Sequence, residues 1–143
     1  MTFFADLITN RIFIAGILTY VITQFLKFVI YSIKTRRFLP KTLLAFGGMP
    51  SSHTSVAFAL LTSIYLSEGV SSLFVVMLFI VVIIIQDISV GRLHTQRNTQ
   101  IINRLLNSIK SKQSPLKEFA AHTQLEILVG AVLGILIALA VFL

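Results

Sequence analysis

Two histidines lie in polar surroundings that are unusual for so apolar a chain. His53 ends the stretch GGMPSSH, and His122 lies four residues before Glu126. Four-residue spacing places His122 and Glu126 on one helix face, where the carboxylate fixes the imidazole tautomer and supports its charged form. Two imidazoles facing a phosphate suggest one reaction, because one can attack phosphorus while the other protonates the leaving oxygen.

The stretch that ends at His53 also predicts an anion site. Gly48 lets backbone N–H groups approach a ligand closely, Pro50 suits a first helical turn, and Ser51 or Ser52 can cap that turn. A helix N-terminus with free N–H groups, hydroxyls and nearby cations binds anions. The candidate cations are Lys27, Lys34, Arg36, Arg37 and Arg92. The alternative, a well-capped membrane helix, explains the serines but not His53.

The composition predicts a membrane protein rather than a soluble enzyme. The 143 residues are 56% hydrophobic and only 12% charged, whereas soluble domains are about a quarter charged. The net charge of +7 would suggest nucleic acid for a soluble protein, but in a membrane protein it indicates cytoplasmic loops and anionic lipid. The length predicts one domain, 1–143, and the start of the chain is not typical of a cleaved signal peptide.

Four apolar runs predict an all-α integral membrane protein with four transmembrane helices. The expected spans are about 11–33, 51–67, 71–88 and 122–143. Most of the Lys and Arg residues fall in the connections 34–50 and 89–121, and none falls in 67–72. Because basic loops stay in the cytoplasm, we expect the candidate site to face the cytoplasm from the plasma (inner) membrane.

The connection before the last span contains a predicted interfacial helix at about 97–111. Its apolar residues fall on one helical face and its polar and basic residues on the other, which suits a helix lying on a bilayer with anionic lipids. A solvated connector helix is the alternative.

Two of the predicted spans carry patterned faces. Tyr20, Gln24, Lys27, Tyr31 and Lys34 step by four and three, which predicts a polar stripe on the first span. In the last span Gly130, Gly134 and Ala138 continue the face of His122 and predict close helix packing. This packing could form within the chain or in a homodimer.

These motifs resemble the divergent branch of the type-2 phosphatidic acid phosphatase and vanadium haloperoxidase superfamily. The resemblance rests on GGMPSSH, a D…R segment, INRL and HTxxE, and it runs from Gln24 to Gly130.

The resemblance implies roles for individual residues, which agree with those assigned from chemistry. Lys27, with Arg36 or Arg37, provides the cations of the first motif, and Arg92 the third-motif arginine, for which Arg97 is a rival. Ser51 binds phosphate and His53 acts as the general acid. His122 is the nucleophile, oriented by Glu126. Ser52, a further candidate phosphate-binding residue, stands where the wider superfamily has glycine.

We therefore expect a metal-independent phosphatase, without a cofactor, that hydrolyses a lipid phosphomonoester such as phosphatidylglycerophosphate or phosphatidate. Nucleic acid is not an expected partner. Two alternatives stay open: a non-catalytic lipid-phosphate binding or transport protein, and a metal hydrolase that uses His53, His122 and Glu126 as ligands.

Overall fold

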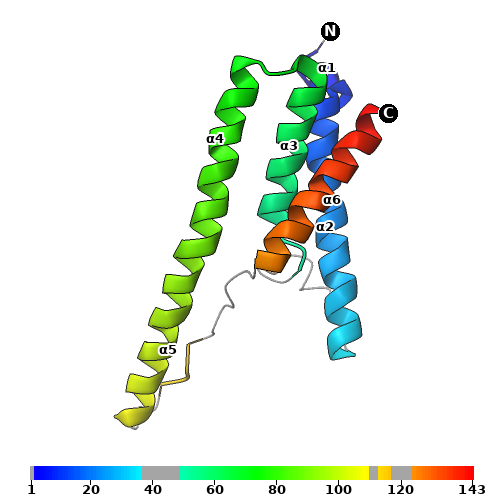
Figure 1. Ribbon diagram of the computed structural model, residues 1–143. Coiled ribbons are helices and arrows are strands. Elements are labelled where there is room, and N and C mark those ends of the chain that lie inside the picture. Colours follow the sequence, from blue (N-terminus) through cyan, green and yellow to red (C-terminus); the bar gives the residue numbers. More distant parts are fainter. Residues whose placement is uncertain (1, 37–48, 110–112, 117–123) are drawn as a thin grey trace.

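The protein is helical wherever the computed structural model describes regular structure, within residues 2–36, 49–109, 113–116 and 124–143. At 91–93 and 96 this description covers the backbone alone. In chain order, the elements are α1 (Phe3–Thr9), α2 (Arg11–Thr35), α3 (Ser52–Glu68), α4 (Ser72–Gln86), the π-helical segment η2 (Asp87–Gly91), α5 (Arg92–Ser108) and α6 (Gln124–Phe142). Figure 1 shows α2, α3 and α6 packed as a bundle, with α4 beside α3.

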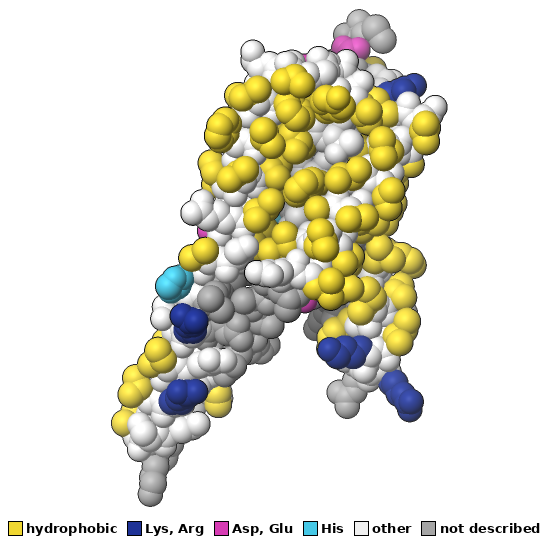
Figure 2. All heavy atoms as spheres, viewed as in Figure 1, with side chains coloured by type: hydrophobic (Ala, Val, Ile, Leu, Met, Phe, Trp, Pro, Cys, Tyr) yellow, Lys and Arg dark blue, Asp and Glu magenta, His cyan; other side chains and the backbone are white. Residues whose placement is uncertain are grey.

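Three helical stretches are long and apolar enough to cross a membrane, namely Arg11–Thr35, Ser72–Val90 and Gln124–Phe142. The predicted class, an all-α membrane protein, is confirmed. The prediction of four such spans is not, because α3 has only 17 residues and begins with polar ones. Figure 2 shows apolar side chains over the upper body, where one basic side chain is also visible, and the other visible Lys and Arg side chains at the lower end, over α5 and the end of α2.

Short polar side chains and glycine set the ends of the long helices. Asn10 caps α2, because its Oδ1 accepts from the N–H groups of Ile12 and Phe13 at 2.9 and 3.1 Å. Ser71 caps α4 in the same way, through Phe74 N at 3.2 Å. Gly69 ends α3 with φ +68°, a conformation that favours glycine. The short turn after it makes α3 and α4 antiparallel.

Small residues on α3 and α6 allow their backbones to approach closely. Ser51, Ser55, Ala59 and Ser63 recur at four-residue steps and are all 0% exposed. A Cβ added to Gly130 of α6 would lie 2.8 Å from the Ser51 carbonyl oxygen.

The next glycine of α6 makes the same kind of contact. A Cβ on Gly134 would overlap the carbonyl oxygen of Ser55. The packing role predicted for the glycine face of α6 is confirmed, and α3 of the same chain is what fills this face.

The buried face of α2 differs from the predicted polar stripe. Ala15, Thr19, Thr23 and Lys27, again at four-residue steps, are the buried residues together with Gly16. Gly16 faces α3, since a Cβ there would lie 3.1 Å from Leu60 Cδ2.

The predicted stripe on α2 was therefore wrong for most of its members. Tyr20, Tyr31 and Lys34 are exposed, and Gln24 is half-buried. Of the stripe, only Lys27 is buried. It lies eleven residues, about three turns, after Gly16, and it therefore shares the helix face on which Gly16 contacts Leu60 of α3.

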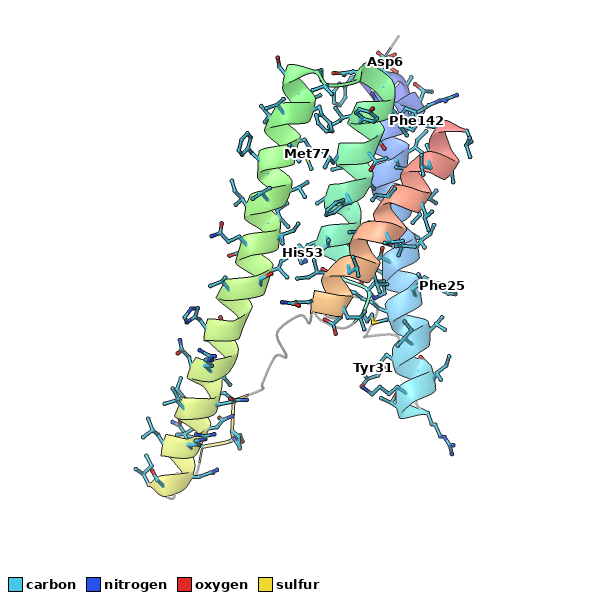
Figure 3. The ribbon with its side chains drawn as sticks, viewed as in Figure 1. Asp6, Phe25, Tyr31, His53, Met77 and Phe142 are labelled. Carbon is cyan, nitrogen blue, oxygen red and sulfur yellow. The ribbon has the colours of Figure 1, made fainter. Side chains whose placement is uncertain are left out.

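The other side of α3 packs against α4. Ala57, Leu61 and Val81 form a buried apolar cluster, and Met77 and Phe58 pack against it. Figure 3 shows Met77 on the side of α4 that faces α3.

The predicted interfacial helix at 97–111 was wrong in its start and in its separation from the third span. Figure 1 shows α4, η2 and α5 as one unbroken helix, so α5 begins at Arg92 rather than at residue 97. The backbone passes from α4 into α5 through a π-helical turn at Asp87–Gly91, and Gly91 does not interrupt the helix. Residues 110–111 lie outside the described part.

The chain after α5 is bonded back to that helix at Leu116. The amide of Asn103 donates to Leu116 O at 3.0 Å and accepts from Leu116 N at 2.8 Å.

Candidate functional site

The first turns of α3 and α6 meet through their backbones. The N–H of Ser51 donates to the carbonyl oxygen of Glu126 at an N···O distance of 3.2 Å. Gly130, one turn further along α6, lies against the Ser51 carbonyl. Two helix N-termini therefore lie at the same end of the bundle, where the N–H groups of first helical turns and the helix dipoles favour an anion.

Hydroxyl groups at the start of α3 are bonded among themselves. Thr54 Oγ1 donates to Ser51 Oγ at 3.0 Å, and both N and Oγ of Ser55 donate to the Ser51 carbonyl oxygen at 2.9 Å. Ser51 is the N-cap residue, yet its side chain makes no capping bond. The prediction that the side chain of Ser51 or Ser52 caps this helix was wrong, because neither hydroxyl makes a capping hydrogen bond.

Lys27 lies at the level of these two helix starts. Arg11 Nη1 donates to Phe142 O at 3.2 Å, which places the start of α2 beside the end of α6. Sixteen residues separate Arg11 from Lys27, and sixteen separate Phe142 from Glu126. Each interval is about 24 Å of helix, so Lys27 and Glu126 occupy the same layer of the bundle. The Lys27 side chain is 9% exposed.

Ser52 and His53 complete the first turn of α3. Ser52 is 7% exposed, and its Oγ has no hydrogen-bond partner among the described residues. His53 is exposed and has a contact of its own. Figure 3 shows His53 at the lower end of α3, near the level where α6 begins. The glutamate predicted to orient the second histidine, Glu126, is half-buried.

Other predicted site residues are not brought into this cluster by the described part of the chain. Arg36 is exposed at the end of α2 with a left-handed φ of 52°, nine residues beyond Lys27 and about 13 Å further along the helix axis. Arg92 begins α5, and its side chain is not described; Arg97 is exposed on that helix.

Three further predicted residues, Arg37, Gly48 and His122, lie outside the described residues. The described residues contain no group of three His, Cys, Asp or Glu that could hold a metal ion. Because His122 is not among them, this finding does not test the metal-hydrolase alternative.

Two buried threonines beside the site were not predicted from the sequence. Thr54 bonds to Ser51, and Thr23 lies one turn before Lys27, with its hydroxyl donating to Thr19 O at 2.6 Å. The signal for Thr23 was the four-residue step of the small residues Ala15, Thr19 and Thr23, which leads to Lys27. That step stands out only once the partner helices are known.

At this end of the bundle an anion would meet two helix N-termini, the ammonium group of the largely buried Lys27, and the Ser52 hydroxyl, which has no partner among the described residues. A phosphate monoester matches this set, because its charged oxygens accept hydrogen bonds from all of these donors.

Comparisons with known proteins identify the family of the chain. No solved structure matches the chain. A membrane protein of Bacillus subtilis (strain 168), named "Uncharacterized membrane protein YuiD", is 31% identical over 150 aligned positions. The alignment covers 94% of this chain and 95% of that protein. The model of the family described as "Divergent PAP2 family" matches residues 8–137. The chain therefore belongs to the divergent PAP2 family.

Proposed function

We propose that the protein is a membrane phosphatase that hydrolyses a lipid phosphomonoester of the phosphatidylglycerophosphate or phosphatidate type. The observation that carries this proposal is the bond between Ser51 N and Glu126 O at 3.2 Å. It joins the helix that starts with the Ser-Ser-His motif to the helix whose first turn carries the predicted histidine-orienting glutamate. Lys27 lies in the same layer, so a cation is available to the phosphate oxygens.

The proposed reaction proceeds in two displacements at phosphorus. A ring nitrogen of His122 attacks phosphorus, and the bond to the ester oxygen breaks while His53 gives its proton to that oxygen. The lipid leaves as an alcohol. Water then loses a proton to His53 and attacks the phosphohistidine, which releases inorganic phosphate and restores both imidazoles. Cations and backbone N–H groups stabilise the charge on the equatorial oxygens throughout.

We further propose that α3 forms a short fourth span and that the active site faces the cytoplasm. Eight of its residues are buried, and its antiparallel pairing with α4 is that of consecutive spans. A helix of 17 residues is about 26 Å long, slightly less than a bilayer core, so its first turn would be recessed from the lipid headgroups. A lipid phosphate could reach that turn while its acyl chains remain in the bilayer.

The basic end of the molecule supplies the proposed contact with anionic lipid. Lys34, Arg36, Arg97 and Arg104 are exposed there on α2 and α5. Charges of this kind attract anionic headgroups, which concentrates an anionic substrate near the site.

The test is phosphate release by the detergent-purified protein from phosphatidylglycerophosphate and from phosphatidate, in the presence of a chelator. We expect release by the wild type and loss of release in His53→Ala and His122→Ala. His94→Ala, a histidine exposed on α5, is the matched control and should retain activity.

Three results would contradict the proposal in different ways. Activity that the chelator abolishes would favour the metal hydrolase. Lipid-phosphate binding without release by the wild type would favour the non-catalytic binding or transport protein. Full activity of both His53→Ala and His122→Ala would exclude the two-histidine mechanism.

A further inference from the structure

We propose that Ser52, rather than Ser51, supplies the hydroxyl that contacts the phosphate, and that Lys27 faces it across the bundle. This inference rests on the proposed phosphate site. It differs from the role that the resemblance implies, in which Ser51 is the phosphate-binding serine, and from the wider superfamily, which has glycine at the position of Ser52.

The hydrogen bonds of the hydroxyls at the start of α3 separate the two serines. Ser51, Thr54 and Ser55 are fully buried and bonded to one another. Ser52 is 7% exposed, yet its Oγ has no partner within the described chain. A buried hydroxyl without a hydrogen bond is costly, so it is expected to meet a ligand or water. Of these four hydroxyls, only that of Ser52 is left for a ligand.

The helical phase of Ser52 directs it into the bundle. Ser52, Ala59 and Ser63 are separated by seven and four residues and therefore share one stripe of α3. Ala59 and Ser63 are 0% exposed, and the backbone N of Ala59 lies 3.0 Å from the position of a Cβ on Gly134. The stripe thus faces the interior of the bundle, on the side where α6 packs.

Lys27 approaches the same interior from α2. It lies eleven residues, about three turns, beyond Gly16 and therefore on the face that contacts Leu60. From that contact, Lys27 is about 16 Å down α2 and Ser52 about 12 Å down α3. The two positions therefore differ by about 4 Å along the bundle. Side chains lean toward the N-terminus of their own helix, and α2 and α3 are antiparallel. The side chains of Lys27 and Ser52 therefore lean toward each other, which closes this difference.

Ser51 has a different part in this arrangement. Its N–H is bonded to Glu126 O, its carbonyl packs on Gly130, and its hydroxyl accepts from Thr54. These contacts attach α3 to α6, which makes Ser51 a positioning residue that holds the first turn of α3 in place.

The experiment compares alanine variants of the two serines by orthovanadate binding to the full-length protein in detergent. Loss of one hydrogen bond to a charged ligand is expected to weaken binding by about tenfold to a hundredfold in Ser52→Ala. Ser51→Ala should lower the melting temperature more than Ser52→Ala and weaken vanadate binding less. Ser67→Ala, at the exposed far end of α3, is the matched control. A greater loss of affinity in Ser51→Ala, or wild-type affinity in Ser52→Ala, would overturn the inference.

A second measurement remains informative if an alanine variant does not fold. The chain has no cysteine, so Ser52→Cys and Ser51→Cys each carry a single thiol of nearly the same size as serine. Inorganic phosphate should slow the reaction of Cys at position 52 with a small thiol reagent and leave the rate at position 51 less changed. The reverse pattern would contradict the proposal.

Failure of the proposed activity would be distinguishable from failure of this inference. Vanadate binding by the wild type without phosphate release would reject hydrolysis, and a weaker Ser52→Ala would still support the Ser52 contact. Phosphate release by the wild type and equally by Ser52→Ala would reject the Ser52 contact alone. A folded wild type with neither binding nor release would reject both.

Discussion

The backbone N–H of Ser51 donates a hydrogen bond to the carbonyl oxygen of Glu126 at 3.2 Å, which joins the starts of two helices through residues that are 75 positions apart in the chain. The small residues that follow on both helices make this contact possible, because a larger side chain at Gly130 would meet the Ser51 carbonyl. Helix packing and the candidate phosphate site therefore depend on the same residues.

The glycines of α6 are predicted to be less tolerant of alanine than the glycine of α2. In Gly134→Ala the new methyl group meets backbone atoms of Ser55, so the helices must separate, at a cost of about 1–3 kcal/mol. In Gly16→Ala it meets the flexible end of Leu60 at 3.1 Å, and the gain of about 0.5–1 kcal/mol from replacing a helical glycine offsets the crowding. Thermal unfolding in detergent checks this. Equal melting temperatures for the two variants would contradict the observed packing.

The hydroxyl of Thr54 is predicted to stabilise the start of α3. Thr54→Val keeps the shape but removes the donor to Ser51 Oγ, so we expect a loss of about 1 kcal/mol and a lower melting temperature. Thr54→Ser keeps the donor and should lie closer to the wild type. If Thr54→Ser were less stable than Thr54→Val, the methyl group rather than the hydrogen bond would account for the role of this residue.

Lys27 is predicted to provide charge to the phosphate site. Lys27→Met should weaken orthovanadate binding by at least about tenfold, because a charge-assisted hydrogen bond in a largely buried layer is lost. Lys27→Arg should retain part of the affinity. The control for a general change in net charge is Arg104→Met, on the exposed surface of α5. An equal loss in Arg104→Met would show that the effect is long-range rather than local.

The orientation in the membrane is predicted from the charge of the connections. In this cysteine-free chain, a cysteine replacing Val70 in the exposed turn after α3 should react with a membrane-impermeant thiol reagent added outside the cell. A cysteine replacing Lys41 should react only after the membrane is opened. External labelling at position 41 would place the candidate site on the opposite side of the membrane.

Much of the fold followed from hydrophobic patterning. Runs of apolar residues predicted the positions of α2, α3, α4 and α6 within a few residues, because a segment that must satisfy its backbone in lipid forms a helix. The end of the third helix did not follow, since the chain continues from α4 into the amphipathic residues of α5 through a π-helical turn, and Gly91 at the end of that turn does not stop the helix. The positions of the helices depend on the local run of apolar residues. The point at which the third helix ends depends on interactions that composition does not reveal.

Part of the candidate site also followed from the sequence. The Ser-Ser-His motif and the glycine face of α6 were recognisable from residue types and spacing alone, because a helix N-terminus and a four-residue step have local signatures. The tertiary structure decided which face of α2 is buried, and so separated Lys27 from Tyr20 and Tyr31. It also decided that Ser51 bonds within the chain while the Ser52 hydroxyl has no described partner. Both outcomes depend on how neighbouring helices are rotated against one another, and that rotation is set by contacts between residues far apart in the chain.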